Sequence, residues 1–97
     1  MNKCYLQRWE TSIRGKGVYP GGCSIHFDVE DHESYLDGIY NKRDDVVPDE
    51  YELSSGKLID CYISDELFEC VVTAGSIYIT ETGLNNMIDM CLISFGY

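Results

Sequence analysis

Residues 23–30 read Cys23-Ser24-Ile25-His26-Phe27-Asp28-Val29-Glu30, an alternation of apolar and polar side chains with a period of two. This period is typical of a β-strand with one buried and one solvated face. We therefore expect Cys23, Ile25, Phe27 and Val29 to face the core, and Ser24, His26, Asp28 and Glu30 to face outward. A first strand over residues 3–10 and the glycine-rich loop that follows it predict a long hairpin with this segment.

A short helix is expected directly after this strand, over residues 31–41. Asp31 can cap its N-terminus, and the acids of the first turn suit the positive end of the helix dipole. The predicted buried stripe of this helix consists of Tyr35, Leu36, Ile39 and Tyr40. Glu33 and Asp37 then lie one turn apart on the exposed side, with no cation between them.

The second half of the chain contains short β-prone runs. We expect strands over 51–54 and 57–63, joined by a turn at Ser55-Gly56, and a closing strand over 90–95, with one or two helical turns within 82–89. The sequence of residues 64–74 is compatible with a helix or a strand. We prefer a strand over 67–73 that pairs with 76–80, because Val71 and Val72 are β-branched. The whole pattern predicts one domain over residues 1–97, of the α+β class, with a mainly antiparallel sheet and one or two short helices.

The charge of the chain is concentrated in one block. Fourteen of the 17 acidic residues lie between Asp28 and Glu69, together with only three basic residues, while the whole chain has a net charge of −10. Tyrosines and aliphatic residues are interleaved with these acids, so the block can be ordered. An acidic surface of this kind repels nucleic acid and anionic membranes and attracts basic proteins. We therefore expect a basic protein as partner, without direct contact to nucleic acid or membrane.

The five cysteines are odd in number and irregularly spaced. The first residues lack the apolar run of a signal peptide, and no stretch is long enough to span a membrane. We therefore expect a soluble, cytoplasmic protein with free thiols and no intramolecular disulfide. Cys23 and His26 form a lone CxxH pair, too few ligands for a metal site, so we expect no metal and no cofactor.

Motifs for catalysis are weak. The glycine-rich stretch from Gly15 to Gly22 lacks the Ser or Thr that follows the lysine in a phosphate-binding loop. Cys23 and His26 stand three residues apart on a predicted strand and so point to opposite faces, which argues against a catalytic pair. The acids are abundant, but a hydrolytic carboxylate pair needs burial in a pocket. These observations predict a protein that is not an enzyme.

The small size, the acidic block and its aromatic content, chiefly over residues 28–52, resemble the small acidic immunity proteins that bacteria pair with secreted nuclease toxins, including those of contact-dependent growth inhibition systems. The resemblance implies a single α+β domain that binds a cognate nuclease toxin domain and plugs its basic active site with carboxylates. If the acidic block is the binding face, the expected partner-binding residues are Asp28, Glu30, Glu33, Tyr35, Asp37, Tyr40, Asp44 and Asp45.

Two other functions are compatible with the same sequence. The first is a phage-encoded inhibitor that mimics nucleic acid and blocks a host defence nuclease. The second is a small enzyme that uses paired carboxylates, which would require a deep pocket with two converging acids and a perturbed pKa.

Overall fold

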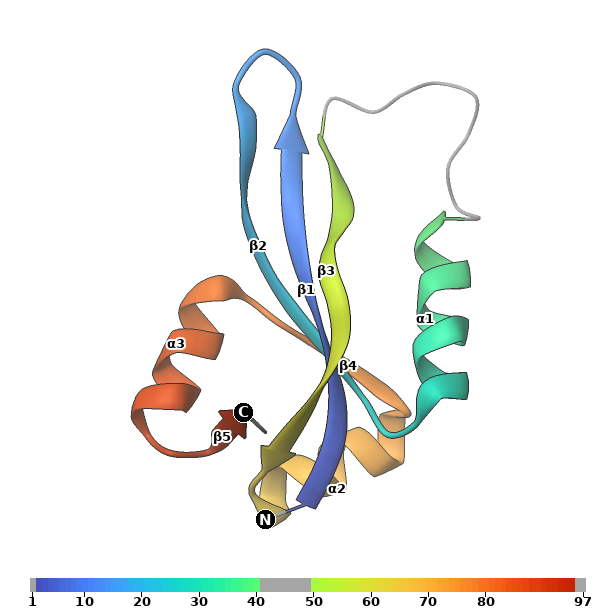
Figure 1. Ribbon diagram of the computed structural model, residues 1–97, viewed down its shortest axis with the longest axis vertical. Coiled ribbons are helices and arrows are strands. Elements are labelled where there is room, and N and C mark those ends of the chain that lie inside the picture. Colours follow the sequence, from blue (N-terminus) through green and yellow to red (C-terminus); the bar gives the residue numbers. More distant parts are fainter. Residues whose placement is uncertain (1, 41–49, 96–97) are drawn as a thin grey trace.

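A five-stranded antiparallel sheet forms the centre of the protein in the computed structural model, which describes residues 2–40 and 50–95. The strand order is β4-β2-β1-β3-β5 (Figure 1). Three helices accompany the sheet, which confirms the α+β class and the antiparallel pairing but exceeds the one or two helices expected. The elements are β1 (Asn2–Ile13), β2 (Gly17–His26), α1 (Val29–Tyr40), β3 (Glu50–Ile63), α2 (Asp65–Ala74), β4 (Ser76–Ile79), α3 (Glu81–Asp89) and β5 (Ile93–Phe95).

The sheet is covered on both faces. One face carries the hydrophobic core, in which Leu6 of β1 and Ile25 of β2 are grouped with Val71 of α2 and Leu84 of α3. The other face carries Trp9, and α1 packs there through the ring of Tyr35. Figure 1 shows α1 and α3 on opposite sides of the strands. Among the described elements, this layering places α1 on the face of the sheet opposite the hydrophobic core.

The segment over residues 23–30 is only partly the strand that its alternation predicts. Cys23 and Ile25 are completely buried in the core, as expected. The strand ends at His26, however, so Phe27 and Val29 do not face the core and are 44% and 47% exposed.

The expectation that Ser24 and His26 face solvent is also wrong, because both are fully buried. The alternation correctly separates the two faces of β2. It does not reveal that a helix covers the second face as well.

The hairpin between β1 and β2 is confirmed, but its loop is much shorter than expected. The turn occupies residues 14–16, and the rest of the glycine-rich stretch belongs to β2. Pro20 is tolerated within β2 because β4 pairs only with Cys23–His26, so β2 has no second neighbour at Pro20. The three long strands therefore project beyond the helices as an arm (Figure 1).

Two local predictions in the second half of the chain are wrong. Ser55 and Gly56 form no turn, because β3 runs without interruption from Glu50 to Ile63 and its pairing with β1 shifts between Ser55 and Ile59. This insertion of extra residues is a bulge, which a Ser-Gly pair accommodates as readily as a turn.

Residues 65–74 are a helix and not the preferred strand. The hydroxyl of Ser64 accepts a hydrogen bond from the Leu67 N–H at 3.4 Å and caps the helix. Gly75 ends it with a φ of +80°. Residues 76–79 then pair with β2, which replaces the predicted hairpin with 67–73.

Gly22 lies where the connection from β4 to α3 passes close to the backbone of β2. Its φ is +87°, and a side chain at this position would overlap the carbonyl oxygen of Ile79. Its N–H donates a hydrogen bond of 3.2 Å to the carboxylate of Glu81, which also accepts two hydrogen bonds from Arg8. Only glycine combines this φ with this close approach.

We predict opposite effects of two glycine substitutions on stability. Gly22→Ala should lower the free energy of unfolding by about 2–4 kcal/mol, because it adds both backbone strain and a steric overlap. Gly38→Ala should raise it by about 0.5–1 kcal/mol, because Gly38 lies within α1 and a Cβ there meets no atom within 4 Å. Urea unfolding of the two variants measures both values. Equal stability of Gly22→Ala and the wild type would contradict the close approach of the β4–α3 connection to the backbone at Gly22.

Candidate functional site

The outer face of α1 carries the acids that the sequence singled out. Glu30, Glu33 and Asp37 are exposed, and α1 contains no Lys or Arg. The helix begins two residues earlier than expected, and its cap is Asp28 instead of Asp31, because the Asp28 carboxylate accepts a 2.8 Å hydrogen bond from the Asp31 N–H. Three exposed carboxylates thus project from one helix, whose first turn is capped by a fourth, that of Asp28.

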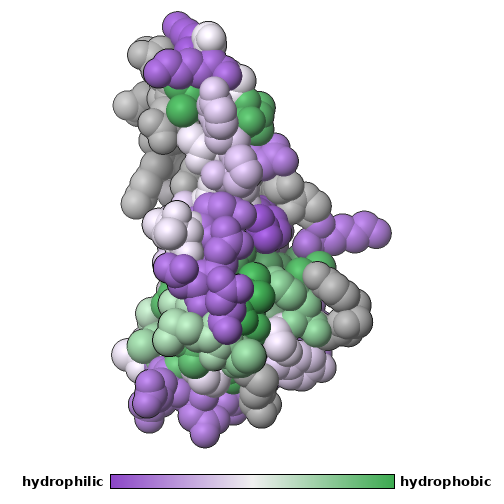
Figure 2. Space-filling model, turned by 90° about the vertical axis from the view of Figure 1, so that its left-hand side faces the viewer, coloured by the Kyte–Doolittle hydropathy of each residue, from purple (hydrophilic) through white to green (hydrophobic). Residues whose placement is uncertain are grey.

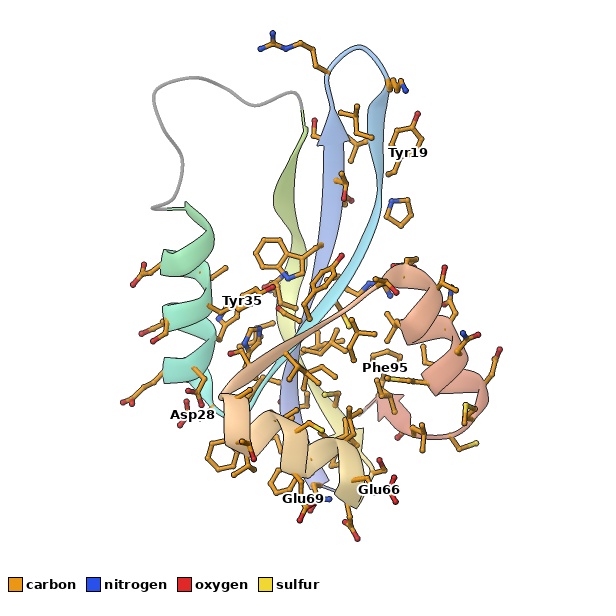
Figure 3. The ribbon with its side chains drawn as sticks, turned by 180° about the vertical axis from the view of Figure 1, so that it is seen from behind. Tyr19, Asp28, Tyr35, Glu66, Glu69 and Phe95 are labelled. Carbon is orange, nitrogen blue, oxygen red and sulfur yellow. The ribbon has the colours of Figure 1, made fainter. Side chains whose placement is uncertain are left out.

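The aromatic residues expected beside these acids are placed differently. Tyr35 points toward the sheet (Figure 3), where its ring lies 6.0 Å from that of Trp9 and 5.2 Å from that of His26. It therefore attaches α1 to the sheet and does not share the outer face with Glu33. Tyr40 ends α1, but its side chain lies outside what the structure describes, as do Asp44 and Asp45.

A chain of buried hydrogen bonds lies beneath α1. The Trp9 indole N–H donates to Ser24 Oγ at 2.8 Å, and Ser24 Oγ lies 2.7 Å from His26 Nε2. On the other side of the ring, His26 Nδ1 lies 2.7 Å from Ser76 Oγ, whose hydroxyl donates to the Asp31 carbonyl of α1 at 3.3 Å. The chain connects β1, β2, β4 and α1.

The hydrogen-bond donors in this chain determine which ring nitrogen of His26 carries the proton. A neutral ring with its proton on Nδ1 lets Ser24 donate to Nε2 and lets Nδ1–H donate to Ser76, so that each buried donor has an acceptor. A protonated ring would leave the Ser24 hydroxyl, which already accepts from Trp9, without an acceptor for its hydrogen. The arrangement therefore favours neutral His26.

Burial and a second histidine lower the basicity of His26. Its pKa falls from 6.5 to about 4, first because burial penalises the charged ring and then because of His32. The rings of His26 and His32 meet edge to face at 4.8 Å between centroids. Burial also lowers the pKa of His32, against the smaller opposing effect of Glu33. Both rings are thus kept neutral where α1 meets the sheet.

Acidification should destabilise the protein through His26. Its pKa is lower in the folded than in the unfolded state, so the unfolded chain takes up the proton first and stability falls as the pH drops from about 6.5 to about 4. The total loss should reach about 3 kcal/mol. Urea unfolding between these pH values measures it. In His26→Asn this part of the pH dependence should vanish, and parallel pH profiles of variant and wild type would contradict the assignment.

Ser24 and His26 have the composition of a nucleophile and its base, but a substrate cannot reach them in the folded structure. Ser24 is fully buried, and both ring nitrogens of His26 are engaged by serine hydroxyls. A substrate could reach Ser24 only if α1 were displaced. Among residues 2–40 and 50–95, no group of three or more His, Cys, Asp or Glu side chains is arranged to hold a metal ion.

The thiols divide into a buried and an exposed set. Cys4, Cys23 and Cys61 lie in the core, whereas Cys70 and Cys91 are exposed, and all five are free. Burial raises the pKa of both Cys23 and Cys61 to about 12 and also raises that of Cys4. The buried thiols are therefore uncharged and inert at neutral pH.

We predict that iodoacetamide modifies two of the five cysteines of the folded protein rapidly. Cys70 and Cys91 should react because they are exposed, and the three core thiols should react only on unfolding. Intact-mass spectrometry counts the adducts, and a sample alkylated in guanidinium chloride gives the reference of five. A stable pair of cysteines that resists alkylation even after unfolding without reductant would reveal a disulfide and contradict free thiols.

The remaining charges separate along the molecule. Asp65, Glu66 and Glu69 are exposed on α2, which also lacks Lys and Arg. Figure 3 shows Asp28 at the start of α1 and Glu66 and Glu69 on α2, at the same end of the molecule. Arg14 and Lys16 lie at the hairpin turn, at the far end, where Figure 2 shows hydrophilic surface. Thus α1 and α2 carry only acidic charges, whereas the cationic Arg14 and Lys16 of the hairpin turn lie beside the start of β3, where Glu50 pairs with Ile13.

A pocket of about 280 Å³ opens along the arm. Its lining combines Arg8, Trp9, Glu10, Val18, Tyr19 and Pro20. Among the described residues its lining has one carboxylate, that of Glu10, whereas a small acidic enzyme would require two converging carboxylates. The acids of α1 instead lie on an exposed helix face.

Sequence reasoning missed two features near α1. One is the hydrogen-bond chain through His26, for which the alternation of β2 gave no signal. The other is an exposed cluster of Phe27, Phe68 and Val72, because Phe27 was assigned to the core.

Comparison of the chain with protein-family models, with curated proteins and with solved structures finds no match. Each helix within residues 2–40 and 50–95 is too short or too polar to cross a membrane. Arguments about function therefore rest on the geometry of the chain itself.

Proposed function

We propose that the protein is an immunity-type inhibitor that binds a basic protein, a nuclease toxin, and covers its cationic site with the outer face of α1. It acts by forming a complex and not by catalytic turnover. The observation that supports this most is the exposure of Glu30, Glu33 and Asp37 on one face of a helix that has no cation of its own.

The attraction between the proposed inhibitor and its partner is electrostatic. Nuclease sites hold phosphates with Lys, Arg and His side chains, so carboxylates presented on a fixed surface are attracted to them. Long-range attraction accelerates the encounter, and the short-range ion pairs hold the complex. Glu33 and Asp37 repel each other slightly in the free helix, and a partner cation placed between them would remove this repulsion.

The fixed position of α1 adds to the argument. Rings of Tyr35, Trp9 and His26 and the hydrogen bond from Ser76 to the Asp31 carbonyl hold the helix on the sheet. A surface that is ordered before binding loses less entropy in the complex. From the expected contact set we retain Glu30, Glu33 and Asp37 as the centre, because Tyr35 and Asp28 already serve the structure of α1 itself.

Affinity isolation from a lysate of the source organism, followed by a nuclease assay on the captured protein, tests the proposal. A captured toxin that loses nuclease activity at about a one-to-one ratio would support it. A captured defence nuclease would favour the phage-type inhibitor instead. Inhibition that requires large excess, or that persists after the inhibitor is removed, would contradict stoichiometric binding.

Charge reversal of the central acids should weaken the complex. We predict that Glu33→Lys combined with Asp37→Lys lowers the affinity for the captured nuclease by several kcal/mol and slows association most at low salt. The control, Asp60→Lys with Asp89→Lys, changes the net charge equally at exposed positions on β3 and α3. Surface plasmon resonance at two salt concentrations measures both rates. Unchanged affinity and association rate of the first variant would place the binding face elsewhere.

A further inference from the structure

Three large apolar side chains adjoin on the surface where α1 meets α2. Phe27 and Val72 are 44% and 49% exposed, and Phe68 is half-buried. The rings of Phe27 and Phe68 are 6.0 Å apart, and Val72 follows Phe68 by one turn of α2. Single exposed apolar residues are common on proteins, whereas a contiguous group marks a surface that is covered in some state. We call this group the apolar patch.

The apolar patch belongs to an ordered part of the backbone. The Phe27 N–H donates a 3.0 Å hydrogen bond to the carbonyl of Gly75, which joins the end of β2 to the end of α2. Phe68 also packs against the core through its inner side. The exposure of Phe27 is therefore a property of the folded structure and not of a loose chain end.

Carboxylates lie next to the patch on both sides. Glu30 follows Phe27 in the first turn of α1, and on α2 Asp65 precedes Phe68 by three residues and Glu69 precedes Val72 by three. Figure 3 shows Asp28 and Glu69 at this same end of the molecule. Neither helix contains a Lys or Arg. An apolar centre with a rim of one charge sign is the arrangement of a protein-binding surface.

We infer that the apolar patch of Phe27, Phe68 and Val72 docks a cationic protein segment, which covers the patch with an apolar side chain and pairs its Lys or Arg residues with the neighbouring acids. This inference rests on the proposed function and extends its contact surface from α1 to α2. The acids would repel a phosphate backbone or an anionic membrane. They would also repel a second copy, whose symmetric interface would bring the same acids together.

A nuclear magnetic resonance titration tests the inference with a defined probe. The probe is a synthetic amphipathic helical peptide of leucine and lysine, added to the ¹⁵N-labelled full chain. The first control peptide has serine in place of leucine, and the second has glutamate in place of lysine. We expect the leucine–lysine peptide alone to bind tightly, with the largest amide shifts at Phe27, Phe68, Glu69 and Val72.

A matched pair of isosteric variants isolates the apolar contribution. Val72→Thr should weaken peptide binding about fivefold, the effect of exchanging one apolar contact for a hydroxyl. Val18→Thr should leave binding unchanged, because Val18 is 53% exposed but lies on the hairpin arm. Thermal unfolding of both variants establishes that they fold. Equal binding of wild type and Val72→Thr, or of the leucine and serine peptides, would overturn the inference.

Other occupants give distinct results. A second copy would be identified by shifts at the patch that grow with protein concentration in the absence of peptide. An anionic ligand would be identified by shifts that a DNA oligonucleotide or phosphatidylglycerol vesicles induce. Either result overturns the inference. The proposed function fails separately. Suppose that charge reversal at Glu33 and Asp37 abolishes nuclease inhibition, but the peptide causes no amide shifts at the patch. The inhibitor function is then supported, and the patch is not part of its docking surface.

Discussion

The hydrogen bond between Ser24 and the buried ring of His26 determines how the two faces of the sheet are used. This polar pair occupies the second face of β2, where burial requires that each polar atom has a hydrogen-bond partner. Trp9 and Ser76 supply these partners and complete the chain. The chain continues to the backbone of α1, so the helix that carries the exposed acids is held by polar contacts as well as by rings. The opposite face is free to form the hydrophobic core with α2 and α3.

Much of the fold follows from local sequence signals, and the errors have physical causes. The hairpin, the inward direction of Cys23 and Ile25 and the presence of α1 were all predictable from periodicity and turn residues. The helix α2 was not, although Ser64 is a good cap, because Val71 and Val72 have a higher β propensity and only packing against the core decides between the two. The burial of His26 depends on α1, which no local pattern of β2 encodes.

Helical periodicity predicts which charged residues lie on the exposed side of α1, and this part of the candidate site was predictable. Glu33 and Asp37 were expected on the exposed side of a helix and lie there, whereas Tyr35 was expected beside them as a partner contact and instead faces Trp9. The apolar patch was not predictable, because the expected strand over residues 23–30 extends four residues beyond the end of β2 and so assigned Phe27 to the core. A strand that ends at His26 turns the next apolar residue outward, and acids of α1 and α2 then lie next to it.

The central claim is that the hydrogen-bond chain holds α1, and with it the acidic face, on the sheet. Hydrogen–deuterium exchange of the α1 amides in wild type and in Ser24→Ala tests this most directly, because the variant leaves the Trp9 indole N–H and His26 Nε2 unpaired. The account predicts protected α1 amides in the wild type and faster exchange in the variant, with the protection of α3 largely retained. Equal exchange of α1 in the two proteins would contradict it.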